Sequence, residues 1–255
     1  MKRSLFFITC CLLSLCAFPQ KAAKKLVWEE DFSGDTLDTK VWNFELGNGC
    51  PDICGWGNNE RQIYTKNNHE LKDGMLYITA KHKDSSYTST RITTAGKKEF
   101  MYGYIEARAK LPIGEGIWPA FWMLGSNIGE KGWPLCGEID ILEYIGKEPH
   151  MVFTSLHTQD SHGETINTKK TKFEAIEEGF HTYAMDWTKD KIAFYVDDVL
   201  VYTFNPENKT EVVWPYNQPF YFLVNMAIGG NFGGPEVDDT IFPQAYILDY
   251  IRVYQ

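Results

Sequence analysis

Near the middle of the chain stands Gly137-Glu138-Ile139-Asp140-Ile141-Leu142-Glu143-Tyr144, a β-prone run with three carboxylates within six residues. Side chains alternate between the two faces of a strand, so Glu138 and Asp140 share one face and the intervening isoleucine takes the other. Glu143 has the opposite parity, and a regular strand would turn it into the core, where an unpaired carboxylate costs several kcal/mol. We therefore expect a β-bulge around Ile141-Leu142 that brings all three acids to one face.

Three acids on one face of a strand supply the groups that cleavage of a glycosidic bond needs. A retaining glycosidase uses two carboxyl groups about 5–5.5 Å apart, one as nucleophile and one as acid/base. A bulged, concave strand would bring Glu138 and Glu143 this close. The other interpretation of an E-x-D pattern is an acidic strand edge that faces solvent, and the surrounding sequence decides between the two.

Alternation at period two recurs along the chain and predicts strands. It is clear at residues 102–111 and 246–254, and Ile192–Val201 predicts a hairpin that turns at Asp197-Asp198. Only Lys172–Glu178 suits a short helical turn. Many short strands separated by Gly-, Pro- and Asn-rich turns, without βαβ alternation, predict an all-β protein with an antiparallel β-sandwich.

Composition limits the class of protein. At 255 residues the chain suits one domain with a substantial core. The net charge of −9 argues against a nucleic-acid or anionic-membrane partner, because both need basic patches. Aromatic residues make up 15% of the chain, which is consistent with sugar-stacking surfaces as well as with ordinary core packing.

The N-terminus has the pattern of an export signal. A basic start is followed by an apolar run, Leu5–Phe18, that is too short for a convincing transmembrane span. We expect residues 1–23 to be a signal peptide and residues 24–255 to form one exported domain that is secreted, periplasmic or attached to the cell surface. An imperfect lipoprotein-processing sequence ends at Cys16, which would provide the lipid anchor.

Three further cysteines lie in the mature chain. Cys50 and Cys54 are four residues apart in a loop, and in an oxidising compartment they would form a local disulfide. Zinc is the alternative for this pair, although no second Cys/His pair with suitable spacing accompanies it. Cys136 is expected to be a buried free thiol beside the acidic strand.

The extended run Gly137–Gly146 resembles the catalytic signature of family 16 glycoside hydrolases, in the longer laminarinase-type spacing rather than the compact EIDIE of lichenases. Other segments resemble laminarinases in the same order along the chain. They are Gly55–Thr65, Gly103–Arg108, Gly116–Gly125, Phe220–Gly230 and Asp249–Tyr254. The resemblance covers residues 27–255 and implies a concanavalin-like β-jelly roll with a concave substrate cleft.

The resemblance also implies roles for the acids. Glu138 would be the nucleophile, and Glu143 would protonate the leaving oxygen and later activate water, with retention of configuration. This requires Glu138 ionised and Glu143 protonated near neutral pH. Asp140 would orient the nucleophile, or otherwise serve as a structural acid bonded to a neighbouring strand.

Five residues are implied to bind substrate. Trp118 and Trp122 have the same strand parity, so both would stack on sugar faces, unless one belongs to the core. Asn59 and Arg91 match positions that bind sugar hydroxyls in laminarinase-like relatives, and His157 matches a cleft histidine. Taken alone, Arg91 would be assigned to a surface ion pair and His157 to a structural hydrogen bond.

Family members commonly hold a structural calcium ion, and chemistry itself requires no cofactor. The ligands here would be backbone carbonyls of Glu30 and Gly74 and the carboxylate of Asp249, an oxygen-only set that suits calcium. Asp249 alternates with Ile247 and Ile251 on an expected apolar face, where an unpaired charge is costly. An ion pair with Lys or Arg is the alternative.

The resulting prediction is a monomeric, exported, retaining endo-glycosidase. It would hydrolyse internal β-1,3-glucosidic linkages of laminarin-type β-glucans, with mixed-linkage glucan as a further substrate. An endo-β-1,4-galactosidase of the same family, a transglycosylase and a non-catalytic glycan-binding module are the alternatives. The intact acid pair argues against the last of these, and the loops Gly47–Gly57 and Gly125–Leu135 are expected to decide the substrate.

Overall fold

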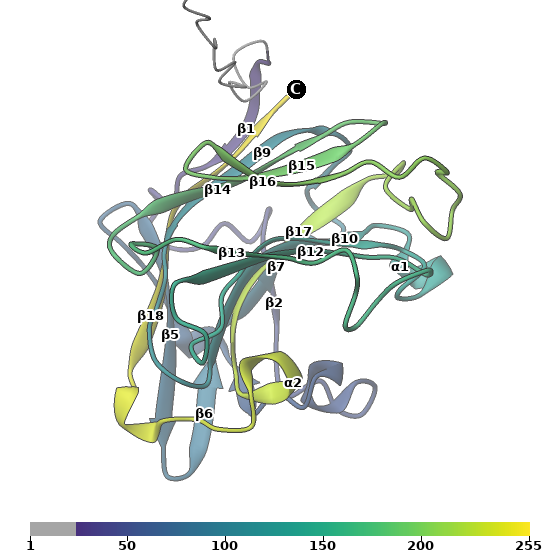
Figure 1. Cartoon of the computed structure of the whole chain (residues 1–255). Coiled ribbons are helices and arrows are strands. Elements are labelled where there is room, and N and C mark those ends of the chain that lie inside the picture. The colour runs from purple at the N-terminus through teal and green to yellow at the C-terminus, as the bar shows by residue number, and fades with distance from the viewer. Residues whose placement is uncertain (1–23) are drawn as a thin grey trace, which may run out of the picture.

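The computed structural model describes residues 24–255, and the expected signal peptide at 1–23 lies outside the described residues. Two β-sheets stack face to face (Figure 1). The ten-stranded sheet has the order β16-β15-β14-β9-β18-β5-β6-β3, with β1 beside β18 and β4 beside β5. Its strands are β1 (Leu26–Glu30), β3 (Gln62–Tyr64), β4 (His69–Lys72), β5 (Met75–Lys83), β6 (Ser86–Ser89), β9 (Gly103–Lys110), β14 (His181–Trp187), β15 (Ile192–Val196), β16 (Val199–Phe204) and β18 (Gln244–Tyr254).

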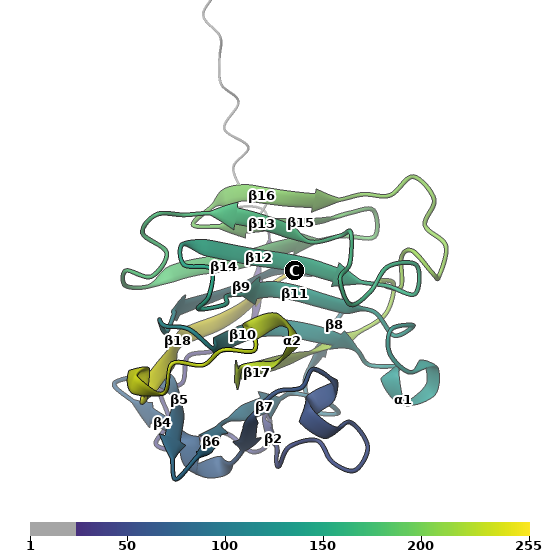
Figure 2. The same ribbon diagram turned by 60° about the horizontal axis from the view of Figure 1, so that its bottom comes forward.

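The eight-stranded sheet has the order β13-β12-β11-β10-β17-β7-β2, with β8 beside β17. Figure 2 shows this sheet with the short helix α2 in front of β10 and β17. Its strands are β2 (Asn43–Glu45), β7 (Arg91–Thr93), β8 (Glu99–Phe100), β10 (Ile117–Gly125), β11 (Glu138–Glu143), β12 (Met151–His157), β13 (Lys169–Lys172) and β17 (Phe220–Ile228). Except for the parallel pair β3–β6, the pairings between named strands are antiparallel, so the predicted antiparallel sandwich is confirmed.

Helical structure in residues 24–255 is confined to short segments, and none of its helices is long and apolar enough to cross a membrane. They are α1 (Ile128–Lys131), α2 (Gly230–Gly233) and the 3-10 segments η2 (Cys54–Gly57), η3 (Lys66–Asn68) and η4 (Asp239–Ile241). The segment 172–178 is not a helix. After β13 it forms turns in which Ile176 bonds to the carbonyl of Phe173 and Glu178 to that of Ala175, a three-residue spacing that does not continue.

The core lies between the two sheets and follows the alternation in the sequence. On β9, Ile105, Ala107 and Ala109 belong to the core, whereas Tyr104 and Glu106 lie on the opposite face of the strand. Much of the aromatic content is also in the core, including Trp42, Trp187 and Trp214. Aromatic and acidic side chains on the outer face of the eight-stranded sheet are therefore not part of this core.

Candidate active site

The acidic strand β11 carries the expected bulge. Between the cross-strand pairs Asp140–Trp122 and Leu142–Phe121 the register shifts by one residue, and Ile141 has no partner on β10. The pairing with β12 shifts over the same residues. Ile141 and Leu142 are both fully buried in the core, so two successive side chains point inward. As a result, the last acid of the strand returns to the outer face.

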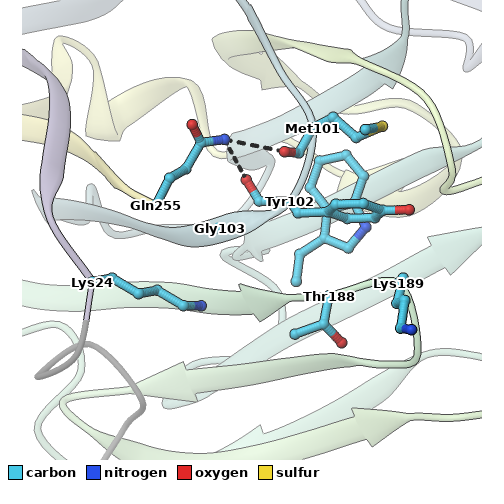
Figure 3. A pocket seen from close by; sticks show the side chains of 8 residues that line it. Lys24, Met101, Tyr102, Gly103, Thr188, Lys189 and Gln255 are labelled. Carbon is cyan, nitrogen blue, oxygen red and sulfur yellow. Dashed lines mark hydrogen bonds between the residues drawn. The ribbon is translucent and has the colours of Figure 1, made fainter.

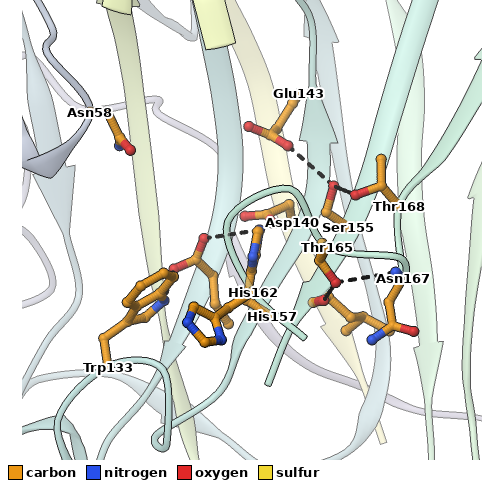
Figure 4. A network of polar contacts seen from close by, with 12 residues as sticks. Asn58, Trp133, Asp140, Glu143, Ser155, His157, His162, Thr165, Asn167 and Thr168 are labelled. Carbon is orange, nitrogen blue, oxygen red and sulfur yellow. Dashed lines mark hydrogen bonds and ion pairs between the residues drawn. The ribbon is translucent and has the colours of Figure 1, made fainter. Parts of the chain in front are cut away.

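Two side chains from other segments, His157 and Trp133, lie beside Asp140 in Figure 4, and both contact Glu138. Nε2 of His157, at the end of β12, lies 3.1 Å from Oδ2 of Asp140 and 3.6 Å from Oε1 of Glu138. The indole N–H of Trp133 donates to Oε2 of Glu138 at 2.8 Å. His157, expected from the sequence to be a cleft histidine, thus lies beside two of the three acids and between Asp140 and Glu138.

Glu143 has a different set of partners. The indole N–H of Trp118 donates to its Oε1 at 3.0 Å, and the hydroxyl of Ser155 lies 3.4 Å from its Oε2. Ser155 in turn accepts a hydrogen bond from Thr168 at 3.0 Å (Figure 4). The three acids thus lie on one side of the sheet, with Glu138 and Glu143 in separate hydrogen-bonding environments.

Burial and nearby charge shift the protonation of both glutamates and of His157. Burial, reinforced by the charge of Asp140, raises the pKa of Glu138 to about 7 and that of Glu143 to about 8. Burial opposes the charged form of His157, but Glu138 and Asp140 outweigh it and raise its pKa to about 9. Both glutamates therefore hold a proton to higher pH than a free glutamate does, and His157 is a cation beside them.

Trp118 and Trp122 are both half-exposed on the outer face of β10, as their parity predicts. Trp118 packs edge-on against Phe232 of α2, with ring centroids 5.4 Å apart. Trp122 donates its indole N–H to Asn225 at 2.7 Å. The guanidinium of Arg91 lies 4.9 Å from the Trp122 ring and also pairs with a glutamate of β2. These aromatic faces adjoin the acids and can stack on sugar rings.

Arg91 is buried between two rings rather than placed in a surface ion pair. It stacks on Trp56 at 4.5 Å as well as on Trp122, and its partner carboxylate is Glu45. Trp56 follows Cys54 by two residues in the loop Gly47–Gly57, which contains the disulfide Cys50–Cys54, so the predicted disulfide is confirmed. This loop therefore fixes one wall of the aromatic surface.

Asn59 lies apart from the acids. It is exposed, has a positive φ of 56°, and donates to Asn231 of α2 at 2.7 Å. Asn59 and Asn231 line a polar hollow of about 370 Å³ with Arg61. The preceding residue, Asn58, is half-buried and is the one drawn with the acidic network in Figure 4.

A second hollow of about 410 Å³ lies on the other sheet (Figure 3). Its walls come from the start of β9, the end of β14 and the last residue of the chain, and they include Tyr102, Trp187 and Gln255. Gln255 is occupied by hydrogen bonds to the carbonyls of Met101 and Tyr102. This hollow contains none of the acids described above and is not part of the candidate active site.

Asp249, one of the expected metal ligands, does not lie on the face of β18 that the sequence predicts. A bulge between Leu248 and Tyr250 of β18 reverses the alternation, so Ile251 faces the core while Asp249 is half-exposed on the outer side. The prediction that Asp249 shares an apolar face with Ile251 is therefore wrong, and its charge is paired with Arg108.

One cluster in residues 24–255 holds three potential metal ligands close together, Glu138, Asp140 and His157, whose donor atoms lie within 4.8 Å of one another. The ion pairs of His157 with Asp140 and Glu138 account for these side chains as a charge-balanced acid cluster. We assign no metal to them. Cys136, directly before this strand, is a buried free thiol as predicted.

The family model of glycosyl hydrolases family 16 matches residues 56–239. The chain belongs to family 16. The crystal structure of a laminarinase from Flavobacterium sp. UMI-01 is 74% identical and has a TM-score of 0.90, covering 91% of this chain and 100% of that chain. A β-glucanase of Rhodothermus marinus is 36% identical over 100% of this chain and 95% of its own length. A glucan endo-1,3-beta-glucosidase of Cryptopygus antarcticus is 38% identical over 94% and 95%.

Membership of family 16 confirms the laminarinase-like resemblance and the jelly-roll fold. Within this family-16 site, the sequence interpretation missed Trp133 and Ser155, which contact the two glutamates. Ser155 could have been found, because it lies two residues before His157 on a strand and shares its face. Trp133 lies in a loop, where no periodicity tells which way a side chain points.

Proposed function

We propose that the protein is a retaining endo-glycosidase that hydrolyses internal β-1,3-glucosidic linkages of laminarin-type β-glucans. The observation that carries the proposal is the bulged strand β11, which presents Glu138 and Glu143 on one face with different hydrogen-bond partners. The similarity to laminarinases and endo-1,3-glucanases over almost the whole chain supports the choice of substrate.

In the first step, a carboxylate oxygen of Glu138 attacks the anomeric carbon of the sugar. The bond from that carbon to the glycosidic oxygen breaks, and the leaving oxygen takes the proton of Glu143. The product is a glycosyl ester on Glu138. Trp118 holds the Glu143 carboxyl group by its indole N–H, which fixes the direction of proton transfer.

In the second step, Glu143 is a carboxylate and removes a proton from water as the water attacks the anomeric carbon. The ester bond to Glu138 breaks, its electron pair returns to the carboxylate, and the sugar leaves with its original configuration. The His157 cation, held by Asp140, lies beside the carboxylate that gains charge in this step. It stabilises that charge by its proximity.

The activity should depend on pH as a bell with its maximum between about pH 7 and pH 8. The two carboxyl groups titrate as a pair: below about pH 7 both carry a proton and Glu138 is no longer nucleophilic, and above about pH 8 both are ionised and the leaving oxygen receives no proton from Glu143. The measurement is kcat/KM for laminarin hydrolysis from pH 5 to pH 10. A rate that keeps rising beyond pH 9 would contradict the role of Glu143 as the acid.

Product analysis tests the substrate. The purified protein is incubated with laminarin, mixed-linkage β-glucan and poly-N-acetyllactosamine, and the oligosaccharides are identified by chromatography and mass spectrometry. Internal cleavage of laminarin into gluco-oligosaccharides supports the proposal. Cleavage of poly-N-acetyllactosamine alone would replace the substrate by a galactose-containing glycan, and binding without cleavage would favour a glycan-binding protein.

We also propose a structural calcium ion held by the carbonyls of Glu30 and Gly74 and the carboxylate of Asp249. The strand register supports this, because both neighbours of β18 place a ligand near Asp249. Glu30 of β1 pairs with Ile251, and Leu248 pairs with Leu76 of β5, which lies two residues after Gly74. Hard oxygen donors suit calcium. Arg108 pairs with the same carboxylate, so a bound cation would compete with that ion pair.

Calcium at about 100 times its Kd is expected to raise the melting temperature by about 5–10 °C, since ligand binding stabilises the folded state by about 2.7 kcal/mol at that concentration. The measurement is thermal unfolding in calcium and in EDTA. Asp249→Asn should lose most of this shift, whereas Asp84→Asn, at an exposed turn, should keep it. An equal shift in both variants would place calcium elsewhere.

Export is a further proposal. Residues 1–23 would be removed as a signal peptide, which leaves the domain 24–255 outside the cytoplasm. The alternative is cleavage directly before Cys16, which would leave that cysteine on the mature chain to carry a lipid anchor. The disulfide Cys50–Cys54 supports an oxidising destination. N-terminal sequencing and mass measurement of the protein in cell fractions would show whether the leader is removed and whether a lipid is attached.

A further inference from the structure

Trp133 touches the nucleophile from outside the strand that carries it. Its indole N–H donates to Oε2 of Glu138 at 2.8 Å, while its ring is 47% exposed (Figure 4). The ring also packs edge-on against His162 at 5.3 Å and lies 6.1 Å from the ring of His157. A tryptophan exposed to this degree is not required by the core, so its hydrogen bond needs a reason of its own.

The loop that carries Trp133 is tied down by its backbone. Cys136 bonds to the carbonyl of Gly132, Gly137 bonds to that of Pro134, and Gln218 donates to the carbonyl of Cys136 at 2.8 Å. Gly137 has a φ of +77° and lies against Pro215, where a Cβ would approach to 2.7 Å. The loop between β10 and β11 is thereby held in one conformation, and the indole reaches Glu138 without further ordering.

The groups facing Glu138 show what the indole adds. Oε1 of Glu138 lies 3.6 Å from His157, but that ring is closer to Asp140, at 3.1 Å. Oε2 accepts a hydrogen bond from the neutral indole N–H of Trp133 at 2.8 Å, which is shorter than the contact of Oε1 with His157. The titratable or charged groups around Glu138 are Asp140 and Glu143 on β11, His157 on β12, Arg91 on β7, Cys136 in the preceding loop, and Tyr216 and Tyr221 before and on β17.

We infer that Trp133 is a positioning residue for the nucleophile: its indole N–H holds the Glu138 carboxylate in its reactive orientation and stabilises its negative charge. The inference rests on the proposed role of Glu138. With Oε2 bonded to the indole, Oε1 is the oxygen left to form the bond to the anomeric carbon. When the ester breaks in the second step, the returning electron pair develops charge on a carboxylate that already has this donor.

Trp133→Phe tests the inference, because it removes the N–H and keeps an aromatic ring against His162. A hydrogen bond to a charged group favours the ionised form, so its loss should raise the pKa of Glu138 by about one unit. We expect kcat for laminarin to fall by about tenfold or more, with KM changed by less than about twofold. The acid limb of the pH profile should move upward by the same unit.

Two readouts separate this inference from the proposed function. The first is a 13C NMR titration of the glutamate carboxyl groups, with the Glu138 signal assigned by its loss in Glu138→Gln; it needs no substrate. The second is laminarin kinetics across pH. If the wild-type protein does not cleave laminarin, the proposed function fails, and the titration still decides whether Trp133 stabilises the charge of Glu138.

Trp28→Phe is the matched control. Trp28 stacks on Phe222 at 5.8 Å on another part of the fold, and its replacement should leave the Glu138 titration and the pH profile unchanged. If Trp133→Phe does not fold, β-(3-benzothienyl)alanine at position 133 keeps the shape of the indole without the N–H. An unchanged pKa of Glu138 in a folded variant, or a rise in KM with kcat intact, would overturn the inference.

Discussion

Glu138→Gln is expected to lower kcat for laminarin by a factor on the order of 10⁴ or more, because an amide of the same shape cannot form the glycosyl ester. Binding should survive, since Trp118, Trp122 and Arg91 remain in place. The measurement is initial rates of reducing-end release together with calorimetric titration by a laminarin oligosaccharide.

Glu29→Gln is the matched control for this variant. Glu29 accepts a hydrogen bond from Arg252 at 2.6 Å on the ten-stranded sheet, far along the chain from β11. It should hydrolyse laminarin at the wild-type rate. Activity of Glu138→Gln within tenfold of the wild type would remove Glu138 from its role as nucleophile, and a loss of binding with the loss of rate would point to damage of the fold.

Glu143→Ala is expected to lower laminarin hydrolysis by about 10³-fold, since general acid and base catalysis contribute about 10²–10⁴-fold. An aryl β-glucoside oligosaccharide with a dinitrophenolate leaving group should still form the glycosyl ester, because that leaving group needs no proton. The second step then lacks its general base. Azide is an anion that attacks the glycosyl ester without a general base, so it should restore turnover and give a β-glycosyl azide.

The stereochemistry of the azide product distinguishes the two glutamates. In Glu138→Ala, azide would attack the anomeric carbon in place of the missing carboxylate and give the α-glycosyl azide. Proton NMR of the anomeric position reports which product forms. An α-azide from Glu143→Ala would mean that the roles of Glu138 and Glu143 are exchanged, and no azide product from either would contradict a glycosyl ester altogether.

Much of the strand framework follows from local alternation. The hairpin at Asp197-Asp198 and the long final strand are both present where the period-two pattern predicts them. The bulge in β11 was predictable because a carboxylate would otherwise have been buried. A similar sign stands at Asp249, a charge expected on an apolar face, but the sequence interpretation attributes it to a bound cation, whereas the structure has a bulge in β18 and an ion pair with Arg108.

The candidate site divides in the same way. Trp118, Trp122 and His157 lie on strands, and parity or the family resemblance placed them beside the acids. Trp133 and Asn58 lie in loops, where turn geometry and long-range hydrogen bonds decide the direction of each side chain. The raised pKa values of Glu138 and Glu143 result from burial, which the sequence does not specify.

The bulge in β11 has a consequence for insertions and deletions. Ile141 and Leu142 both point into the core, so one of them is surplus to the alternation of the strand. A chain shorter by one residue at this place would need no bulge, because the second glutamate would then have the parity of the first. The catalytic pair can therefore tolerate a change of one residue in its sequence spacing while both acids stay on the same face of the sheet.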